Sequence, residues 1–283
     1  MTERSPLPRS FLYVPGSRPD LFEKGHRGEA DAIVLDLEDA VPLPDKEEAR
    51  AQVGRWLEQD PLPDGAEVWV RVSAEFVVAD LEAVVHPAVA GLFVAKASSE
   101  VMTQVDAELT RLEAARSLSA PLGVVALIES ASTLVSLPEL SRHQRVRSFG
   151  VGEVDLLADL RVRRTTGTQA AVDTIRLEIV RHAAAAGLDA PVAPTSTDFR
   201  DLDAFAASTR QLADLGFRSR TAVHPAQARV INQVLTPDAE ALERARRLVA
   251  LAEAAGGGIT VDEDGRLVDA AVVREAHETL SRA

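Results

Sequence analysis

Cysteine is absent from the 283-residue sequence. Disulfide bonds, thiolate metal sites and a cysteine nucleophile are therefore excluded, and a reducing compartment fits this composition. Long apolar runs are absent too: none approaches the ~18 residues that a membrane-spanning helix needs, and no apolar signal segment stands near the start. The sequence therefore predicts a cytoplasmic protein without a membrane partner.

Positive charge is scarce. The chain has 31 lysines and arginines against 44 aspartates and glutamates, which gives a net charge of −13. A nucleic-acid partner is not expected, because such proteins present clustered positive charge to the phosphates. Only Lys24, Lys46 and Lys96 are lysines. An anionic substrate would have to be held by local positive charge.

Apolar runs alternate with segments of helical periodicity, and 46% of the residues are hydrophobic. Several runs are apolar on both faces, as expected of parallel strands covered on both sides. Eight such runs in a chain of this length predict an α/β fold, a (β/α)8 TIM barrel. The predicted strands are Phe11–Val14, Ala32–Leu37, Val68–Val72, Gly91–Ala95, Leu122–Ile128, Val146–Val151, Leu188–Val192 and Thr221–Val223.

Four segments between the runs are predicted helices: Asp45–Leu57, Ser98–Leu118, Thr168–Ala186 and Asp198–Leu215. The first opens with Asp45 in the N-cap position. The tail differs, with a long helix over residues 236–255, a glycine break at 256–258, a hairpin over 259–268 and a last helix from Ala270. We therefore expect a catalytic barrel over residues 1–235 and a helical extension with a lid over residues 236–283.

Charged residues follow most of the predicted strands. In barrels of this kind the active site lies at the C-terminal ends of the strands. A single charge there usually begins a solvated loop, but several on different strands predict a shared site. Those residues are Arg18, the acidic cluster Asp36, Glu38 and Asp39, then Arg71, Lys96, Glu129, Asp155 and His224.

Glu129 and Asp155 are candidate magnesium ligands. Mg²⁺ usually takes one or two carboxylates and completes its octahedron with water and substrate oxygens. Alternatively, Glu129 stabilises a helix N-terminus and Asp155 caps a helix. Glu153 and Asp159 compete with them as ligands, and spacing does not separate these possibilities.

Arg71 lies inside a strand pattern, where a guanidinium needs a partner. Its planar fork suits a substrate carboxylate. It could equally pair with Glu38 and Asp39, and both arrangements could hold together. The acidic cluster could supply a general acid or base, or it could be clamped by Lys46 and Arg50 as a structural network.

Three further positions complete the candidates. Residues 15–18 read Pro-Gly-Ser-Arg, a turn whose glycine would permit close approach of a ligand and whose Arg18 could meet a phosphate. His224 is more simply a structural hydrogen-bonding residue than a base. Tyr13 is expected in the core.

The motifs resemble those of the citrate lyase β-subunit-like branch of the HpcH/HpaI aldolase superfamily, near the malyl-CoA and citramalyl-CoA lyases. The similarity runs from Arg9 to the C-terminus. Its segments are Arg9–Arg18, Ile33–Val41, Asp45–Arg50, Val70–Val72, Leu127–Ala131, Asp155–Leu156 and Val223–Gln227.

The resemblance implies that Glu129 and Asp155 bind Mg²⁺ and that Arg71 holds the carboxylate of a 2-keto acid, supported by Glu38 and Asp39. It implies a coenzyme A thioester as substrate, with Lys96 at the substrate. Pro15, Gly16, Arg18 and Lys24 are placed near the coenzyme A path. The segment 264–269 is similar to a lid motif whose last aspartate, Asp269 in this sequence, acts as acid/base in its own or a neighbouring subunit's site. A homo-oligomer, a trimer, follows from that similarity.

The resemblance also implies the reaction, cleavage or formation of a carbon–carbon bond in a malyl-, citramalyl- or citryl-type thioester. The keto acid released would be oxaloacetate, pyruvate or glyoxylate. Departures such as Arg161 and Ser219-Arg220 border the pocket and leave the substrate preference open. Two alternatives stay open as well: a magnesium-dependent aldolase on free 2-keto acids, and a citrate lyase subunit that acts only on a carrier-bound substrate.

Overall fold

The computed structural model describes residues 5–59, 64–256 and 258–282. The chain divides into two compact units: Leu7–Asn232 form one, and Met1–Pro6 together with Gln233–Ala283 form the other. The boundary predicted after residue 235 falls three residues beyond this division. Among the described residues, no helix is both long enough and apolar enough for a membrane span.

Eight parallel strands close into a barrel, each pairing with the next along the chain and β8 pairing with β1. The predicted (β/α)8 barrel is thus confirmed. The strands are β1 (Ser10–Pro15), β2 (Ala32–Asp36), β3 (Glu67–Val72), β4 (Val89–Val94), β5 (Gly123–Ile128), β6 (Val146–Val151), β7 (Val192–Ala193) and β8 (Ser219–Ala222).

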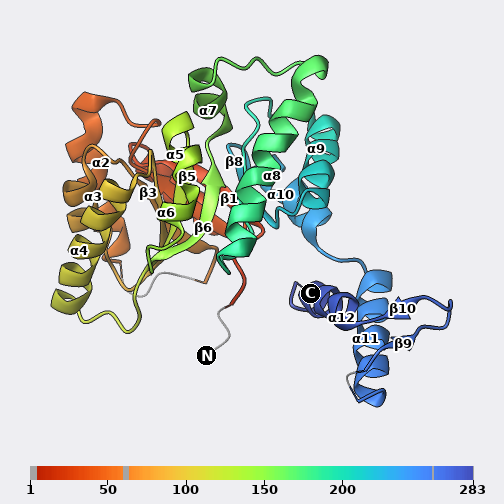
Figure 1. Ribbon diagram of the computed structural model, residues 1–283. Coiled ribbons are helices and arrows are strands. Elements are labelled where there is room, and N and C mark those ends of the chain that lie inside the picture. The colour runs from red at the N-terminus through yellow and green to blue at the C-terminus, as the bar shows by residue number, and fades with distance from the viewer. Residues whose placement is uncertain (1–4, 60–63, 257, 283) are drawn as a thin grey trace. The chain divides into compact units, whose positions relative to one another are not determined.

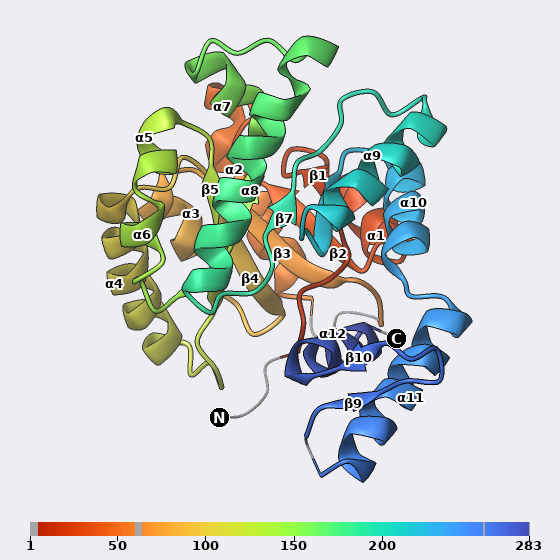
Figure 2. The same ribbon diagram turned by 45° about the vertical axis from the view of Figure 1, so that its right-hand side comes forward.

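Helices surround the barrel. α2, α3 and α4 lie side by side on one flank, and α8, α9 and α10 cover the flank away from α4 (Figures 1 and 2). The helices of this unit are α1 (Phe22–His26), α2 (Lys46–Leu57), α3 (Val77–Val84), α4 (Ser99–Ala115), α5 (Ala131–Val135), α6 (Leu137–Leu140), α7 (Glu153–Asp159), α8 (Gln169–Ala185), α9 (Leu202–Asp214) and α10 (Pro225–Leu235). Short 3-10 turns are η1 (Pro19–Leu21), η2 (Leu43–Asp45) and η3 (Thr166–Thr168).

The barrel interior is filled by inward side chains of alternate strand residues. Phe11, Trp69 and Phe93 are fully buried and meet edge to face, with ring centroids 5.1 to 5.8 Å apart. Gly91 makes this possible, because a Cβ there would lie 2.4 Å from the Trp69 ring. The packed interior is a platform for the polar layer at the C-terminal ends of the strands.

Two predicted elements differ from the structure in local detail. The seventh strand begins at Val192 and not at Leu188, because Pro191 has no N–H for the ladder. Asp45 occupies the N-cap position of α2 as predicted, but its side chain makes no cap hydrogen bond, because it also ends η2 in a helical conformation, whereas an N-cap residue normally has extended backbone.

The first helix of the C-terminal unit, α11 (Ala239–Ala254), packs against α12 (Ala270–Leu280). Between them the predicted hairpin is confirmed, with β9 (Thr260–Val261) antiparallel to β10 (Leu267–Val268). Gly257, part of the predicted glycine break, lies outside the described residues.

Candidate active site

The polar residues of the site continue the inward faces of the strands. Side chains two residues apart on a strand share a face. Trp69 and Leu127 belong to the buried cluster, so Arg71 and Glu129 stand one step further toward the C-terminal ends. They line a cavity of about 800 Å³ together with Asp36, Asp39 and Asp155.

Arg71 is held by three carboxylates. Its Nε and one terminal nitrogen pair with both oxygens of Asp36 at 2.7 and 2.6 Å. Its other terminal nitrogen lies 3.2 Å from Glu38 and 3.5 Å from Asp39. The guanidinium also stands 4.8 Å above the ring of Tyr13. These contacts fix the direction of the fork, and they keep it charged because they raise the pKa of Arg71 against the opposing effect of burial.

The carboxylates of the acidic turn after β2 accept hydrogen bonds from the backbone of the same turn. Asp36 accepts backbone N–H bonds from Glu38 at 2.9 Å and from Ala40 at 3.1 Å, and Glu38 accepts one from Asp39 at 2.8 Å. Asp36 and Glu38 are buried, whereas the Asp39 side chain is 60% exposed. Asp39 is thus the member of the cluster that solvent or substrate can reach.

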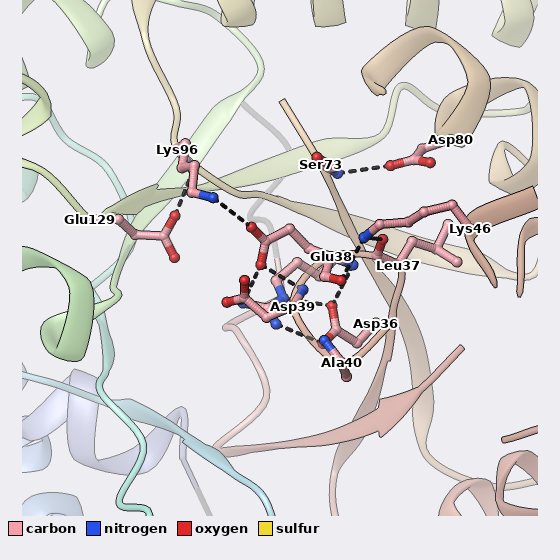
Figure 3. Close-up of polar contacts among 11 residues, drawn as sticks. Asp36, Leu37, Glu38, Asp39, Ala40, Lys46, Ser73, Asp80, Lys96 and Glu129 are labelled. Atoms are coloured by element: carbon pink, nitrogen blue, oxygen red, sulfur yellow. Dashed lines mark hydrogen bonds and ion pairs between the residues drawn. The ribbon is translucent and has the colours of Figure 1, made fainter. Parts of the chain in front are cut away.

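The clamp expected from Lys46 and Arg50 has a different form. Lys46 donates to the backbone carbonyls of Leu37 and Glu38, both at 2.6 Å, and so holds the turn rather than its carboxylates (Figure 3). Arg50 pairs instead with the buried Asp80 at 2.6 Å. The alternative in which Arg50 clamps the acidic cluster is therefore wrong, because α2 presents Arg50 to Asp80 on α3.

Lys96 contacts both Glu129 and the acidic turn after β2. Its backbone N–H donates to Glu129 at 2.6 Å, and its ammonium lies 3.1 Å from Glu38 (Figure 3). Its φ of +48° is in the left-handed region, which a side chain rarely adopts. Strained backbone of this kind concentrates at functional sites.

Glu129 occupies a tightly packed, buried position. Burial raises its pKa to about 7, the Lys96 N–H opposes that rise, and the nearby charge of Glu38 adds to it. A Cβ at Gly152 would lie 2.3 Å from the Glu129 Cγ. Only glycine at position 152 leaves room for the carboxylate as it stands.

Asp155 lies in the first turn of α7, is exposed, and is close enough for its charge to raise the pKa of Glu129. Its two competitors as metal ligands are engaged elsewhere. Glu153 is buried against the fork of Arg176 at 2.7 and 2.9 Å, and Asp159 accepts the Ala131 N–H at 2.7 Å.

The donor set suits a cation that shares its coordination with a substrate. Two carboxylates at one cavity match the preference of Mg²⁺ for one or two protein carboxylates. Within residues 5–59, 64–256 and 258–282, no three or more histidine or acidic side chains form a complete metal cage. The rest of the coordination would have to come from water and substrate.

The residues of the first turn lie at varying distances from the cavity. Pro15 lines it. Gly16 donates to the Asp36 carbonyl at 2.8 Å, and a Cβ there would lie 2.8 Å from that oxygen, so this glycine permits a close approach of two backbones and not of a ligand. Arg18 pairs with Asp20 at 2.7 Å, and Lys24 is exposed on α1; neither is among the described residues that line the cavity.

Tyr13 and His224 have distinct roles. Tyr13 packs on the core cluster as predicted, but it also lines the cavity beneath Arg71. Its position on the inward face with Phe11 is the signal that could have identified it. His224 stacks on Phe199 with centroids 5.4 Å apart and accepts the Ala226 N–H at 3.1 Å, which fits the structural interpretation.

Asp269, in the C-terminal unit, is the N-cap of α12. Its Oδ1 accepts the N–H groups of Ala271 at 2.9 Å and Val272 at 3.1 Å. Because these two bonds engage Oδ1, Oδ2 is the oxygen that could exchange a proton.

The raised pKa of Glu129 predicts that the metal-free protein loses stability as the pH rises. Below its ordinary pKa of 4.5, both the folded and the unfolded state keep the proton. Between 4.5 and about 7 only the folded state keeps it, so the free energy of unfolding declines by roughly 3 kcal/mol in all. Glu129→Gln should lack this decline. Urea unfolding of both proteins in chelator at pH 5 and pH 8.5 measures it, and a pH-independent difference between them would refute the assignment.

The sequence is similar to those of known proteins over nearly its whole length. A family model described as HpcH/HpaI aldolase/citrate lyase matches residues 9–225. A (3S)-malyl-CoA thioesterase of Cereibacter sphaeroides is 33% identical over 281 residues, which cover 97% of this chain and 94% of the relative. The citrate lyase subunit β of Escherichia coli is 31% identical, with coverage of 97% and 93%.

A solved structure is similar over the same extent. It is the protein CitE from Mycobacterium tuberculosis in complex with magnesium, acetoacetate and coenzyme A. It shares 25% identity with this chain at a TM-score of 0.75, and the match covers 97% of each chain.

Proposed function

Since the chain belongs to the HpcH/HpaI aldolase/citrate lyase family, we propose that it is a magnesium-dependent carbon–carbon lyase acting on a malyl-, citramalyl- or citryl-type acyl thioester. It would release a 2-keto acid and a shorter acyl thioester. The observation that carries the proposal is the convergence of Arg71, Glu129 and Asp155 on one cavity. The magnesium and coenzyme A in the related CitE structure support the cofactor and the substrate class.

Each residue has a definite part in this proposal. Glu129 and Asp155 hold Mg²⁺, which when bound supplies a Lewis acid that polarises the oxygens of the keto acid portion. Arg71 binds the carboxylate of that portion through the terminal N–H groups that its bond to Asp36 leaves available. Glu38 and Asp39 orient Arg71, and Lys96 neutralises Glu38.

Proton transfer is assigned to Asp269. As the C–C bond breaks, the substrate hydroxyl gives its proton to the Asp269 carboxylate and becomes the keto oxygen. The electron pair of the broken bond leaves a carbanion on the acyl thioester, which must take up a proton. We propose that Asp269 delivers it from Oδ2 while Oδ1 remains bonded to the start of α12. The homo-oligomer predicted from the lid motif would decide which subunit's site Asp269 serves, and the trimer stays a prediction.

Thioester hydrolysis is the second candidate, because the (3S)-malyl-CoA thioesterase is similar to nearly the whole chain. The two reactions differ in product. Lysis releases a keto acid and keeps the thioester, whereas hydrolysis frees the thiol and keeps the acid intact.

A product assay separates them. Citryl-CoA, malyl-CoA, citramalyl-CoA, 3-hydroxy-3-methylglutaryl-CoA and free citramalate are incubated with Mg²⁺ or with chelator, and keto acid and free thiol are both measured. The protein adds no background to the thiol assay because it has no cysteine. We expect keto acid from one thioester, lost in chelator and in Glu129→Ala.

Other outcomes would change the assignment. Thiol without keto acid would establish hydrolysis, and turnover of citramalate alone would establish an aldolase on free acids. No turnover of any of these substrates would favour a citrate lyase subunit that acts only on a carrier-bound substrate. Undiminished turnover in chelator would overturn the magnesium proposal.

A further inference from the structure

The cavity has a second basic wall, distant from Arg71 in the barrel. Arg164, in the loop after α7, lines it together with Thr195 and Thr197, which follow β7. Arg71 stands on β3, and in a closed barrel of eight strands paired in sequence β3 and β7 lie on opposite sides. A ligand that spans the cavity could therefore touch both walls.

Positive charge exceeds negative charge at this wall. Glu153 is already paired by the fork of Arg176, and Arg164 contacts the same carboxylate. Arg176 also meets Asp173 at 2.9 Å. With Arg220 the group holds three guanidiniums against two carboxylates, a net charge of +1.

Arg220 shows the effect of this excess. Its hydrogen bonds go to neutral acceptors, the Pro194 and Phe205 carbonyls and the Ser208 and Thr209 hydroxyls. Its pKa is lowered to about 9 by burial and then by the charges of Arg176 and Arg164. An anion near Arg164 would relieve that repulsion.

Arg164 is the member that a ligand can reach. Its side chain is 49% exposed, whereas that of Arg176 is 7% exposed. Elsewhere in the lining of the same cavity, the Thr195 hydroxyl is buried and has no hydrogen-bond partner among the described residues. An unsatisfied buried hydroxyl costs roughly 1–3 kcal/mol, which an acceptor atom of a ligand would recover.

We propose that Arg164 and Thr195 form a second carboxylate subsite, so that the keto acid of this enzyme is dicarboxylic, of the oxaloacetate type, and not pyruvate or glyoxylate. Arg71 would hold one carboxylate and Arg164 the other. We assign the carboxylate bound by Arg164 to the keto acid rather than to the acyl thioester. The reason is that Glu153, which contacts Arg164, lies two residues before the proposed metal ligand Asp155 in the same helical turn. The inference rests on the proposed function.

The test is calorimetric titration of the Mg²⁺-loaded protein with oxaloacetate and with pyruvate. Wild type should bind oxaloacetate at least tenfold more tightly. Arg164→Gln should weaken oxaloacetate about 10- to 100-fold and leave pyruvate unchanged, since a hydrogen-bonded ion pair is lost with only one ligand. Thr195→Val should weaken oxaloacetate a few-fold.

Arg163→Gln is the matched control: it removes the same charge one residue away, from an exposed side chain outside the described cavity lining, and should change neither affinity. Equal weakening of both acids by Arg164→Gln would overturn the subsite. So would weakening of a coenzyme A thioester alone, which would assign the charge to a phosphate. If wild type binds neither acid while Arg164→Gln folds normally, the proposed function itself fails and the subsite falls with it.

Discussion

Replacement of Arg71 by lysine should lower kcat/KM by about 10³-fold. Lysine keeps the charge near Asp36 but loses the planar fork that can bind two carboxylates at once. A substrate carboxylate would then lose one of its paired, charge-assisted hydrogen bonds. Steady-state kinetics of wild type and Arg71→Lys, on the thioester identified by the product assay, measures this change in kcat/KM.

Arg50→Lys is the matched control for this variant. Arg50 and Asp80 form an ion pair of similar burial, with side chains 15% and 0% exposed against 11% and 2% for Arg71 and Asp36. Both lysine variants should lose comparable stability, and only Arg71→Lys should lose activity. Equal activity losses would show that Arg71 acts through folding and not through substrate.

Addition of one methyl group at position 152 should weaken both metal binding and catalysis. In Gly152→Ala the new Cβ would lie 2.3, 2.6 and 2.9 Å from the Cγ, Oε1 and Cδ of Glu129, so the carboxylate itself must move. A displacement of about 1 Å can cost roughly 10²-fold in catalysis. We expect kcat to fall at least that far and Mg²⁺ affinity to fall with it.

Gly91→Ala provides the comparison. Its Cβ would lie 2.4 Å from the Trp69 ring, an equal overlap in the barrel core beneath the site. Both variants should be destabilised by roughly 1–3 kcal/mol, as overpacked cores are. Retained Mg²⁺ affinity in Gly91→Ala and its loss in Gly152→Ala would attribute the effect to Glu129. Retained affinity in Gly152→Ala would contradict the close packing of Gly152 against that carboxylate.

The barrel could be predicted from sequence because its strands are apolar on both faces and alternate with amphipathic helices. The strand ends followed from the same pattern and led to Arg71 and Glu129. Where the structure differs from the prediction, the cause is local: Pro191 delays the start of β7, and a 3-10 turn holds the N-cap residue Asp45 in a helical conformation in which its side chain makes no cap hydrogen bond.

The partners of the site residues could not be predicted in the same way. The fork of Arg71 binds Asp36 because the β2–β3 register sets these two residues side by side, and no sequence pattern reports that register. Arg50 faces Asp80, 30 residues away, for the same kind of reason. Glu153 and Asp159 rank with Asp155 in the sequence, and only their contacts with Arg176 and Ala131 distinguish them.

The proposal that Glu129 and Asp155 bind one magnesium ion is tested most directly by calorimetric titration of Mg²⁺. At pH 8, where Glu129 is ionised, the titration is run on wild type, Asp155→Asn and Asp159→Asn. Asp159→Asn is the control, because an amide oxygen can still accept the Ala131 N–H. We predict one ion per chain, at least tenfold weaker binding in Asp155→Asn, and wild-type affinity in Asp159→Asn. Equal affinities in wild type and Asp155→Asn would contradict the proposed metal site.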